Sequence, residues 1–229
     1  MGRRHLLPVR GRTVAHEKIL ILESTWALEA DDYISDSRST ARIYLSFESL
    51  LSRHDVPVFA VHRPLLASRY IEDIRQFVSL PANERQMNIV ILSAHGTFTR
   101  IQKGDKKVNR RRLHAIDAEI KLSRDIHELK GELKRTVFIL DACDVGARVG
   151  EFRKAANALG VIGFSQTVDW ADSAIFVLAL LLHIQTQGIF QKPESDARAL
   201  VRHLVDDLRQ GTYKSLAKAL GLEVAWADS

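Results

Sequence analysis

The sequence lacks what several classes of protein require. It has one cysteine in 229 residues, so the chain can form no internal disulfide and no metal site made of several thiolates. This cysteine usage fits a reducing compartment. The longest strongly apolar segment, residues 174–182, is much shorter than the roughly 20 residues that cross a bilayer. Because the start of the chain also lacks the pattern of a signal peptide, we expect a soluble, cytoplasmic protein that does not bind membranes.

Repeats, low-complexity segments and long Pro/Gly/Ser linkers are missing as well. The hydrophobic fraction of 46% is ordinary for a globular protein, and this length fits one domain with an ample core. We therefore expect a basic N-terminal arm at residues 1–17, followed by a single domain over residues 18–229.

Positive charge exceeds negative charge, with a net charge of +5 and an isoelectric point near 9.4. Part of this excess is local, because six cations crowd residues 103–112: Lys103, Lys106, Lys107, Arg110, Arg111 and Arg112. The segment is either a solvated loop or a basic surface, for docking an acidic partner or for self-cleavage. No aromatic residue stands between these cations to stack on bases, so we do not expect a nucleic-acid partner.

Short apolar runs alternate with stretches of helical periodicity. The runs predict strands at residues 18–22, 57–61, 89–94, 137–140 and 161–164. The periodic stretches predict helices near 43–51, 71–78, 113–133, 149–159 (ended by Gly160), 171–184, 197–208 and 213–220, with a polar tail after the last. Residues 97–108 predict a small β-hairpin with its turn at 103–105. This alternation indicates an α/β sandwich, with a mostly parallel sheet and helices on both faces.

Two of the predicted strands stop at a residue capable of catalysis. The run N-I-V-I-L-S-A-H-G ends at His95 and Gly96, and the run T-V-F-I-L-D-A-C ends at Cys143. Carboxyl ends of parallel strands meet at one edge of a sheet, where ligands bind. If these two strands are neighbours, their tips lie about 5 Å apart at the backbone. An imidazole base and a thiol nucleophile can then converge on one peptide carbonyl, with the N–H groups of Gly96 and Cys143 as oxyanion donors.

These residues resemble those of the caspase-like (clan CD) cysteine peptidases, which include caspases, metacaspases, separases and bacterial CHAT-type proteases. His95-Gly96 and Asp141-Ala142-Cys143 each follow an apolar strand, and 48 residues separate base from nucleophile, close to the roughly 50 of caspases. Residues 161–188 resemble the strand, acidic loop and helix that close this fold, so the resemblance covers about residues 18–210. It implies a caspase-like three-layer sandwich with Cys143 as nucleophile, His95 as base and Gly96 as an oxyanion donor. The chain departs from the caspase motif Q-A-C-[RQG]-G by reading D-A-C-D-V-G.

The resemblance also implies a substrate preference. In this family the residue two before the nucleophile lines the pocket for the side chain preceding the cut, and metacaspases, which have Asp there, cut after Arg or Lys. Asp141 therefore predicts cleavage after Arg or Lys, since a carboxylate pairs well with a guanidinium. Asp169 and Glu23, which follow two other strands, are expected to add negative charge to the same edge. Asp141 alternatively caps a turn.

We accordingly expect a cysteine endopeptidase that requires no cofactor or metal and is restrained by a partner, a ligand or self-cleavage. Bacterial relatives often act in antiviral defence or cell death. Two alternatives remain: a catalytically silent binding module on the same fold, and a doubly wound nucleotide binder, although no G-x-G-x-x-G or G-x-x-x-x-G-K-[ST] run follows any strand. The eight other histidines are expected to be surface or structural residues.

Overall fold

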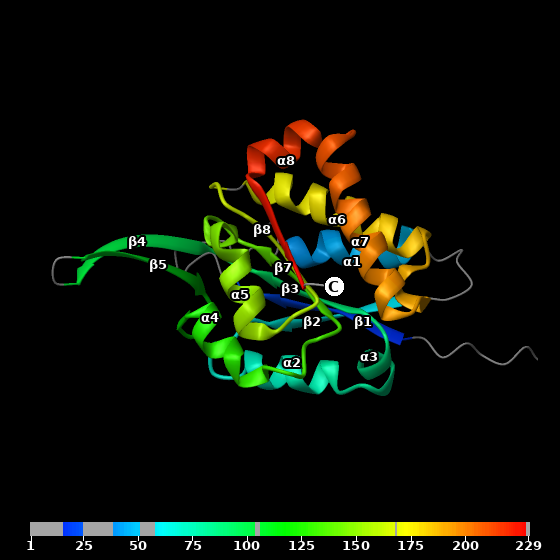
Figure 1. Cartoon of the computed structure of the whole chain (residues 1–229), viewed down its shortest axis with the longest axis horizontal. Coiled ribbons are helices and arrows are strands. Elements are labelled where there is room, and N and C mark those ends of the chain that lie inside the picture. Colours follow the sequence, from blue (N-terminus) through cyan, green and yellow to red (C-terminus); the bar gives the residue numbers. More distant parts are fainter. Residues whose placement is uncertain (1–15, 25–38, 51–57, 104–105, 168, 228–229) are drawn as a thin grey trace, which may run out of the picture.

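A six-stranded sheet forms the centre of the molecule, in the order β2-β1-β3-β7-β8-β9 (Figure 1). The structure is a computed structural model that describes residues 16–24, 39–50, 58–103, 106–167 and 169–227. The strands of the sheet are β1 (His16–Glu23), β2 (Val58–Pro64), β3 (Asn88–Ser93), β7 (Thr136–Asp141), β8 (Gly160–Phe164) and β9 (Leu222–Trp226). All neighbouring pairs are parallel except β8 with β9, so the predicted mostly parallel sheet is confirmed. All of the predicted N-terminal arm before residue 16 lies outside the described residues.

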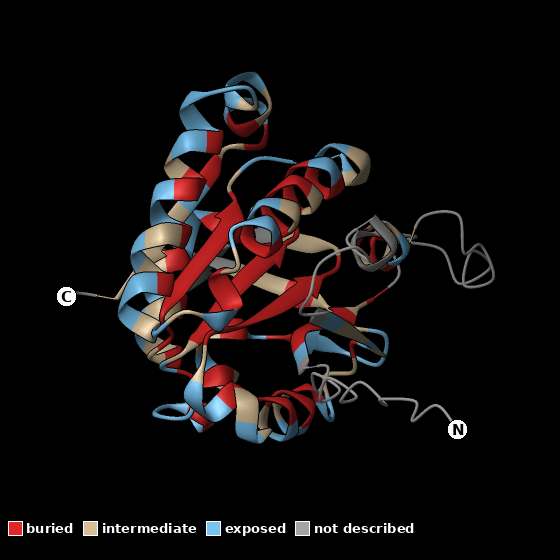
Figure 2. Ribbon diagram, turned by 90° about the vertical axis from the view of Figure 1, so that its right-hand side faces the viewer, coloured by how far each residue is buried: buried red, intermediate tan, exposed pale blue. Residues whose placement is uncertain are grey.

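Helices cover both faces of this sheet. One face carries α1 (Thr40–Leu50), α6 (Trp170–Thr186), η5 (Ile189–Gln191), α7 (Glu194–Gln210) and α8 (Lys214–Leu220). The other carries α2 (Tyr70–Val78), α3 (Pro81–Arg85), α4 (Leu122–Asp125), η3 (Ile126–Leu129) and α5 (Val149–Ala156), while η4 (Val145–Arg148) lies at the sheet edge. Alternate strand residues face alternate layers: Ile19 and Ile21 pack toward α6, and Leu20 and Leu22 pack toward α2. The sheet is consequently buried on both sides (Figure 2), and the architecture is a three-layer α/β sandwich.

The predicted β-hairpin is present and projects from the body of the molecule (Figure 1). β4 (Gly96–Lys103) pairs with β5 (Lys106–His114), and a short strand, β6 (Glu119–Ile120), adds to β5. Residues 104 and 105 of the predicted turn lie outside the described residues, but Lys103 and Lys106 on either side of it are paired.

The long helix predicted over residues 113–133 was wrong. Leu113 and His114 belong to strand β5, and between β6 and β7 the chain forms two short helical segments, α4 and η3. Tertiary contacts outweigh helical periodicity here, because the Asp117 carboxylate accepts the backbone N–H groups of Ala67 and Ser68 and holds the chain in a turn.

The predicted polar tail and the predicted end of the helix at Gly160 were also wrong. Residues 222–226 form β9, which pairs antiparallel with β8. Helix α5 ends earlier, at Asn157, whose left-handed φ of 53° terminates it. Gly160 instead begins β8, where a β-carbon would lie 2.2 Å from the ring of Trp226, so only glycine leaves room for this side chain.

The predicted apolar helix at 171–184 is confirmed as α6, whose side chains are largely buried. Within the described residues, no helix has the length and apolar character needed to cross a membrane.

Candidate active site

His95 and Cys143 follow two adjacent parallel strands at matching positions. β3 pairs with β7 so that Ser93 lies opposite Asp141, and each reactive residue comes two positions later. The Ala94 N–H donates to the Asp141 carbonyl at 3.1 Å, so the pairing continues past the strand ends. The fold therefore brings both residues to one edge of the sheet. His95 is partly exposed there, whereas the Cys143 side chain is only 8% exposed.

The backbone of Gly96 packs directly against Cys143. A β-carbon on Gly96 would lie 1.9 Å from the Cys143 carbonyl oxygen and 2.7 Å from Cγ2 of Val145, so no other residue fits without a shift of the backbone. Gly96 was expected to donate its N–H to a substrate oxyanion, and that role stays a prediction. In the structure, the missing side chain makes room for the backbone of Cys143 and for Val145.

The hairpin also sets the direction of the Gly96 N–H. His114 donates its N–H to the His95 carbonyl at 2.9 Å, which makes these two residues a hydrogen-bonded pair of the antiparallel ladder. Gly96 and Leu113, the next pair, are then a non-hydrogen-bonded pair. The Gly96 N–H consequently points away from β5, as a donor to a bound substrate must.

The turn after Cys143 is held from two sides. Asp144 has a φ of 58°, a left-handed conformation that aspartate tolerates better than most residues. Its N–H donates to the Gln166 carbonyl at 3.2 Å, and its carbonyl accepts Nε of Arg111 at 2.7 Å. Val145 donates its N–H back to the Cys143 carbonyl at 2.6 Å. Arg111 was predicted only as part of an exposed basic segment, so sequence reasoning missed its contact with this turn.

Three polar residues stand side by side across the sheet beneath this edge. Glu23 on β1 lies opposite Ser93 on β3, and Ser93 lies opposite Asp141 on β7. We call these three residues the polar row. It faces helix α1, from which Thr40 places its hydroxyl 2.6 Å from that of Ser93. Sequence reasoning singled out the two acids but missed Ser93, whose only signal was a polar residue at the end of an apolar strand.

Asp141 is fully buried in this row. Its Oδ2 accepts the hydroxyls of Tyr44 and Ser93, the latter at 3.0 Å, while Oδ1 has no hydrogen-bond partner among the described residues. Burial raises the pKa of Asp141 to about 6. Hydrogen bonds from neighbouring hydroxyls act to lower this pKa, because they favour the charged form, but burial outweighs them. Tyr44 is the second residue that the sequence did not reveal, because it reads there as one more apolar position of an amphipathic helix.

Glu23 has a structural role that the sequence did not reveal. Oε1 accepts the N–H groups of Thr40 and Ala41 and the Thr40 hydroxyl, and Oε2 accepts the Ser39 hydroxyl and lies 3.2 Å from Nε2 of His62. Burial acts to raise the pKa of Glu23, but these hydrogen bonds outweigh it and lower the pKa below its usual value. The carboxylate therefore caps the N-terminus of α1, and its contribution to a substrate pocket stays a prediction.

Asp169 caps α6 in the same way. It is exposed, and its side chain accepts the Ala171 N–H at 2.8 Å. It follows β8 at the same edge of the sheet as Cys143, which is the edge predicted for it. Its role toward a substrate also stays a prediction.

A second histidine lies close to the candidate base. Burial lowers the pKa of His114, and the positive charges of His95 and Arg112 lower it further. Its Nε2 lies 3.1 Å from the Thr97 hydroxyl. Because His114 was expected to be structural, its position beside His95 is a finding of the structure.

Metal binding has no support in the part of the chain that is described. No three His, Cys, Asp or Glu side chains gather there closely enough to hold an ion. The acidic members of the polar row are separated by Ser93, and their oxygens accept hydrogen bonds from Thr40 and Tyr44.

Comparison with known proteins assigns no family. No protein-family model matches the chain, and no curated protein matches it in sequence. Protein GSU0716 from Geobacter sulfurreducens is 12% identical, with a TM-score of 0.43 and 92% of each chain covered. Raptor from Chaetomium thermophilum is 11% identical, with a TM-score of 0.37 over 83% of this chain and 20% of that one. At these TM-scores neither likeness bears on function.

Proposed function

We propose that this protein is a cysteine endopeptidase of the caspase-like type, with Cys143 as nucleophile and His95 as general base. One observation carries the proposal: the two residues occupy matching positions after β3 and β7, which are adjacent and parallel. A histidine and a cysteine 48 residues apart in the sequence thus meet at the edge of the sheet where α/β proteins bind ligands.

The chemistry follows from this placement. The imidazole of His95 takes the proton from the thiol of Cys143, and the thiolate attacks the scissile carbonyl. The oxyanion that forms accepts hydrogen bonds from the backbone N–H groups of Gly96 and Cys143. His95 then gives its proton to the leaving amine, and water releases the acyl group from the sulfur in the same manner.

Asp141 gives the proposed enzyme its preference for Arg or Lys before the cut. It precedes Cys143 by two residues and therefore faces the same side of the sheet. Its Oδ1 is buried and lacks a hydrogen-bond partner among the described residues, which favours pairing with an incoming cation. A guanidinium at this position would also lower the raised pKa of Asp141, because an opposite charge favours the ionised carboxylate.

Restraint of activity is part of the proposal. Asp141 is fully buried and Cys143 is 8% exposed, so a basic substrate side chain reaches them only after a local rearrangement. We therefore assign the described conformation to a resting form that a partner, a ligand or self-cleavage activates.

Fluorogenic peptides with Arg, Lys or Asp before the cut test the proposal. We expect cleavage of the Arg and Lys peptides, and at least about a 1,000-fold loss of kcat/KM in Cys143→Ala and in His95→Ala. His203→Ala is the matched control, because His203 is an exposed histidine on α7 that lies beside Asp207. Cleavage that persists in Cys143→Ala, or that occurs after Asp alone, contradicts the proposal.

A catalytically silent module is the second candidate, and the low exposure of Cys143 favours it. Reaction with iodoacetamide distinguishes the two, because Cys143 is the only thiol in the chain. An activated thiolate reacts at neutral pH faster than a free cysteine, whereas an inert structural thiol reacts only on unfolding.

A further inference from the structure

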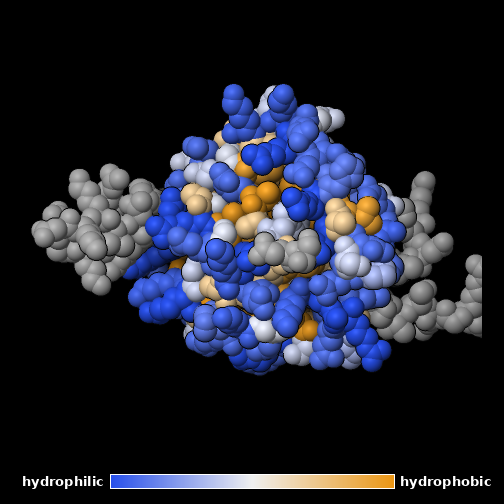
Figure 3. Space-filling view, in the orientation of Figure 1, coloured by the Kyte–Doolittle hydropathy of each residue, from blue (hydrophilic) through white to orange (hydrophobic). Residues whose placement is uncertain are grey.

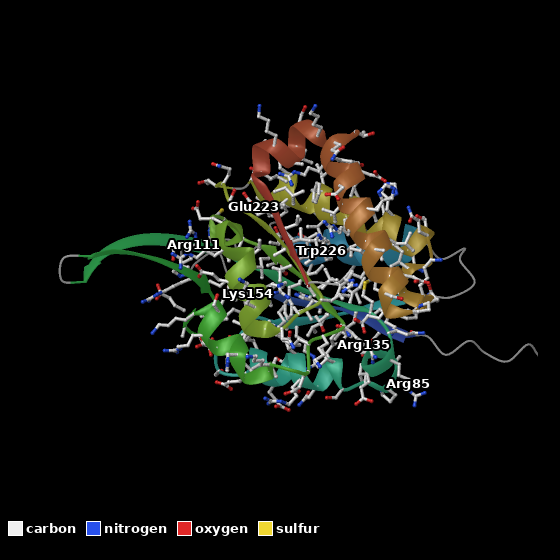
Figure 4. The ribbon with its side chains drawn as sticks, in the orientation of Figure 1. Arg85, Arg111, Arg135, Lys154, Glu223 and Trp226 are labelled. Atoms are coloured by element: carbon white, nitrogen blue, oxygen red, sulfur yellow. The ribbon has the colours of Figure 1, made fainter. Side chains whose placement is uncertain are left out.

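A cavity of about 290 Å³ opens beside the candidate active site, on the opposite face of the sheet from the polar row. It lies between α4, α5 and the base of the β4–β5 hairpin. Arg111, labelled in Figure 4, stands where the hairpin joins the body beside α5. Figure 3 shows strongly hydrophilic residues on the surface of this region.

Cations dominate the rim of the cavity. Five line it: Arg111, Arg112, Lys121, Arg124 and Arg148. Three of them pair with carboxylates: Glu119 and Glu151 are exposed, at 40% and 58%, and Asp125 is half-buried, at 22%. Glu151 also lines the cavity, so the lining carries five cations and one carboxylate. Exposed pairs of this kind contribute about 1 kcal/mol or less, so an anion that enters the cavity competes with them easily. The rim therefore favours a ligand with several negative charges.

The wall of the cavity is apolar. Leu122, Leu140 and Phe152 line it from α4, β7 and α5. A free phosphate or an acidic side chain would leave this apolar wall exposed to water. A ligand that joins a flat ring to a charged group would cover it. Guanidinium groups also stack on flat rings and bind phosphate with two parallel hydrogen bonds. The volume is close to the lower limit of small-ligand pockets, which suits one mononucleotide.

Two residues join this cavity to the turn that carries Cys143. Arg111 lines the cavity and donates Nε to the Asp144 carbonyl at 2.7 Å. Val145 also lines it, and donates its N–H to the Cys143 carbonyl at 2.6 Å. A phosphate that contacts Arg111 would fix this guanidinium, and with it the strained Asp144 next to the cysteine.

We propose that this cavity binds a mononucleotide, with its phosphates on the cationic rim and its base against the apolar wall, and that the bound nucleotide increases the reactivity of Cys143 through Arg111. The binding part is independent of the proposed function, and the regulatory part rests on it. The site differs from the nucleotide-binding alternative raised by the sequence, which required a glycine-rich loop after a strand.

Calorimetric titration of the full chain with ADP, GDP and UDP tests the binding part, with the matching nucleoside (adenosine, guanosine or uridine) and pyrophosphate as the separated halves of each ligand. We expect at least one nucleotide to bind with a Kd below about 1 mM, tenfold or more tighter than either half, and more weakly as salt rises. No binding, or pyrophosphate binding as tightly as every nucleotide, overturns the proposal.

Charge reversals locate the site. Lys121→Glu and Arg148→Glu should each weaken nucleotide binding about tenfold or more, because each replaces an attraction by a repulsion. Arg209→Glu, on the exposed surface of α7 across the sheet, is the matched control and should change affinity less than twofold. Equal losses in all three variants, or none, overturn the assignment to this cavity.

The rate at which iodoacetamide alkylates Cys143 tests the coupling without any need for peptide cleavage. A saturating nucleotide should increase the rate at least threefold in the natural chain, and Arg111→Ala should remove the increase. An unchanged or slower rate overturns the regulatory part. Binding and coupling without peptide cleavage would instead contradict the proposed endopeptidase function alone.

Discussion

The two faces of the sheet carry opposite charge where they meet Cys143. On the side of α1 and α6, the polar row is acidic and buried, and hydrogen bonds fix each of its side chains. On the side of α4 and α5, the cavity rim is basic, and its ion pairs are exposed or half-exposed. The two sides are separated because consecutive side chains of a strand point to opposite faces of the sheet, and Asp141 and Leu140 are consecutive residues of β7. Burial thus ties the acidic side into the fold, while exposure allows the ion pairs of the basic side to exchange partners.

The largest expected loss of stability is at Gly96, beside Cys143, where the two faces of the sheet meet. Gly96→Ala should destabilise the protein by about 3 kcal/mol or more and abolish reaction at Cys143, because the new methyl group would meet a backbone carbonyl at 1.9 Å. Chemical denaturation measures the loss. Gly150→Ala is the control, because a β-carbon there has nothing within 4 Å, and in helix α5 it should be neutral or stabilise slightly.

The next largest effect is on the pH dependence of stability, to which the buried acidic side contributes through Asp141. The folded protein holds a proton on Asp141 up to about pH 6, whereas the unfolded chain releases it near the usual pKa of 3.8. The folded state therefore binds more protons between about pH 4 and pH 6, and stability falls as pH rises through that window. Asp141→Asn should remove this pH dependence, which lowers the free energy of unfolding by roughly 3 kcal/mol in total across the window.

Thermal unfolding at a series of pH values, compared between the natural chain and Asp141→Asn, measures the slope. Asp196→Asn, a change on the exposed α7 surface, should leave it unaltered. Identical slopes in the natural chain and in Asp141→Asn would mean that Asp141 is not the titrating group.

A smaller effect concerns the other acid of the polar row. Glu23→Gln should cost about 1–2 kcal/mol, because a neutral amide caps α1 less well than a carboxylate and one of its two polar atoms cannot accept hydrogen bonds. The midpoint of urea unfolding measures it. A loss below about 0.3 kcal/mol would show that the cap contributes little and that Glu23 is free for the predicted substrate role.

The smallest effect is expected on the basic side. Arg124→Ala removes an ion pair with Asp125 in which the arginine side chain is 70% exposed, and should change stability by less than about 0.5 kcal/mol. The same unfolding measurement applies. A loss as large as that of Glu23→Gln would mean that the rim is a structural network, which would remove the contrast between the two sides.

Much of the architecture was readable from local patterns. The runs at residues 89–94 and 137–140 are apolar at consecutive positions, as strands covered on both faces must be, and they became β3 and β7. The wrong predictions of secondary structure arose where contacts with residues distant in the sequence decide the structure. Residues 222–226 have little strand signal of their own and pair only because β8 offers an open edge.

The candidate site likewise contains some residues that the sequence revealed and others that it did not. His95, Gly96 and Cys143 were readable because each ends an apolar run, which marks it as a residue at the carboxyl end of a strand. Tyr44 and Arg111 were not, because their importance depends on hydrogen bonds to Asp141 and Asp144, which belong to other elements.

The sequence by itself determined which residues end the central strands, since hydrophobic periodicity is a local property of the chain. Only the tertiary structure decided that β3 and β7 are neighbours in register, and that acidic and basic side chains gather on opposite faces beside Cys143. The physical reason is that strand order, burial and ion pairing depend on contacts between residues far apart in the chain, and these contacts leave no periodic trace in the amino-acid order.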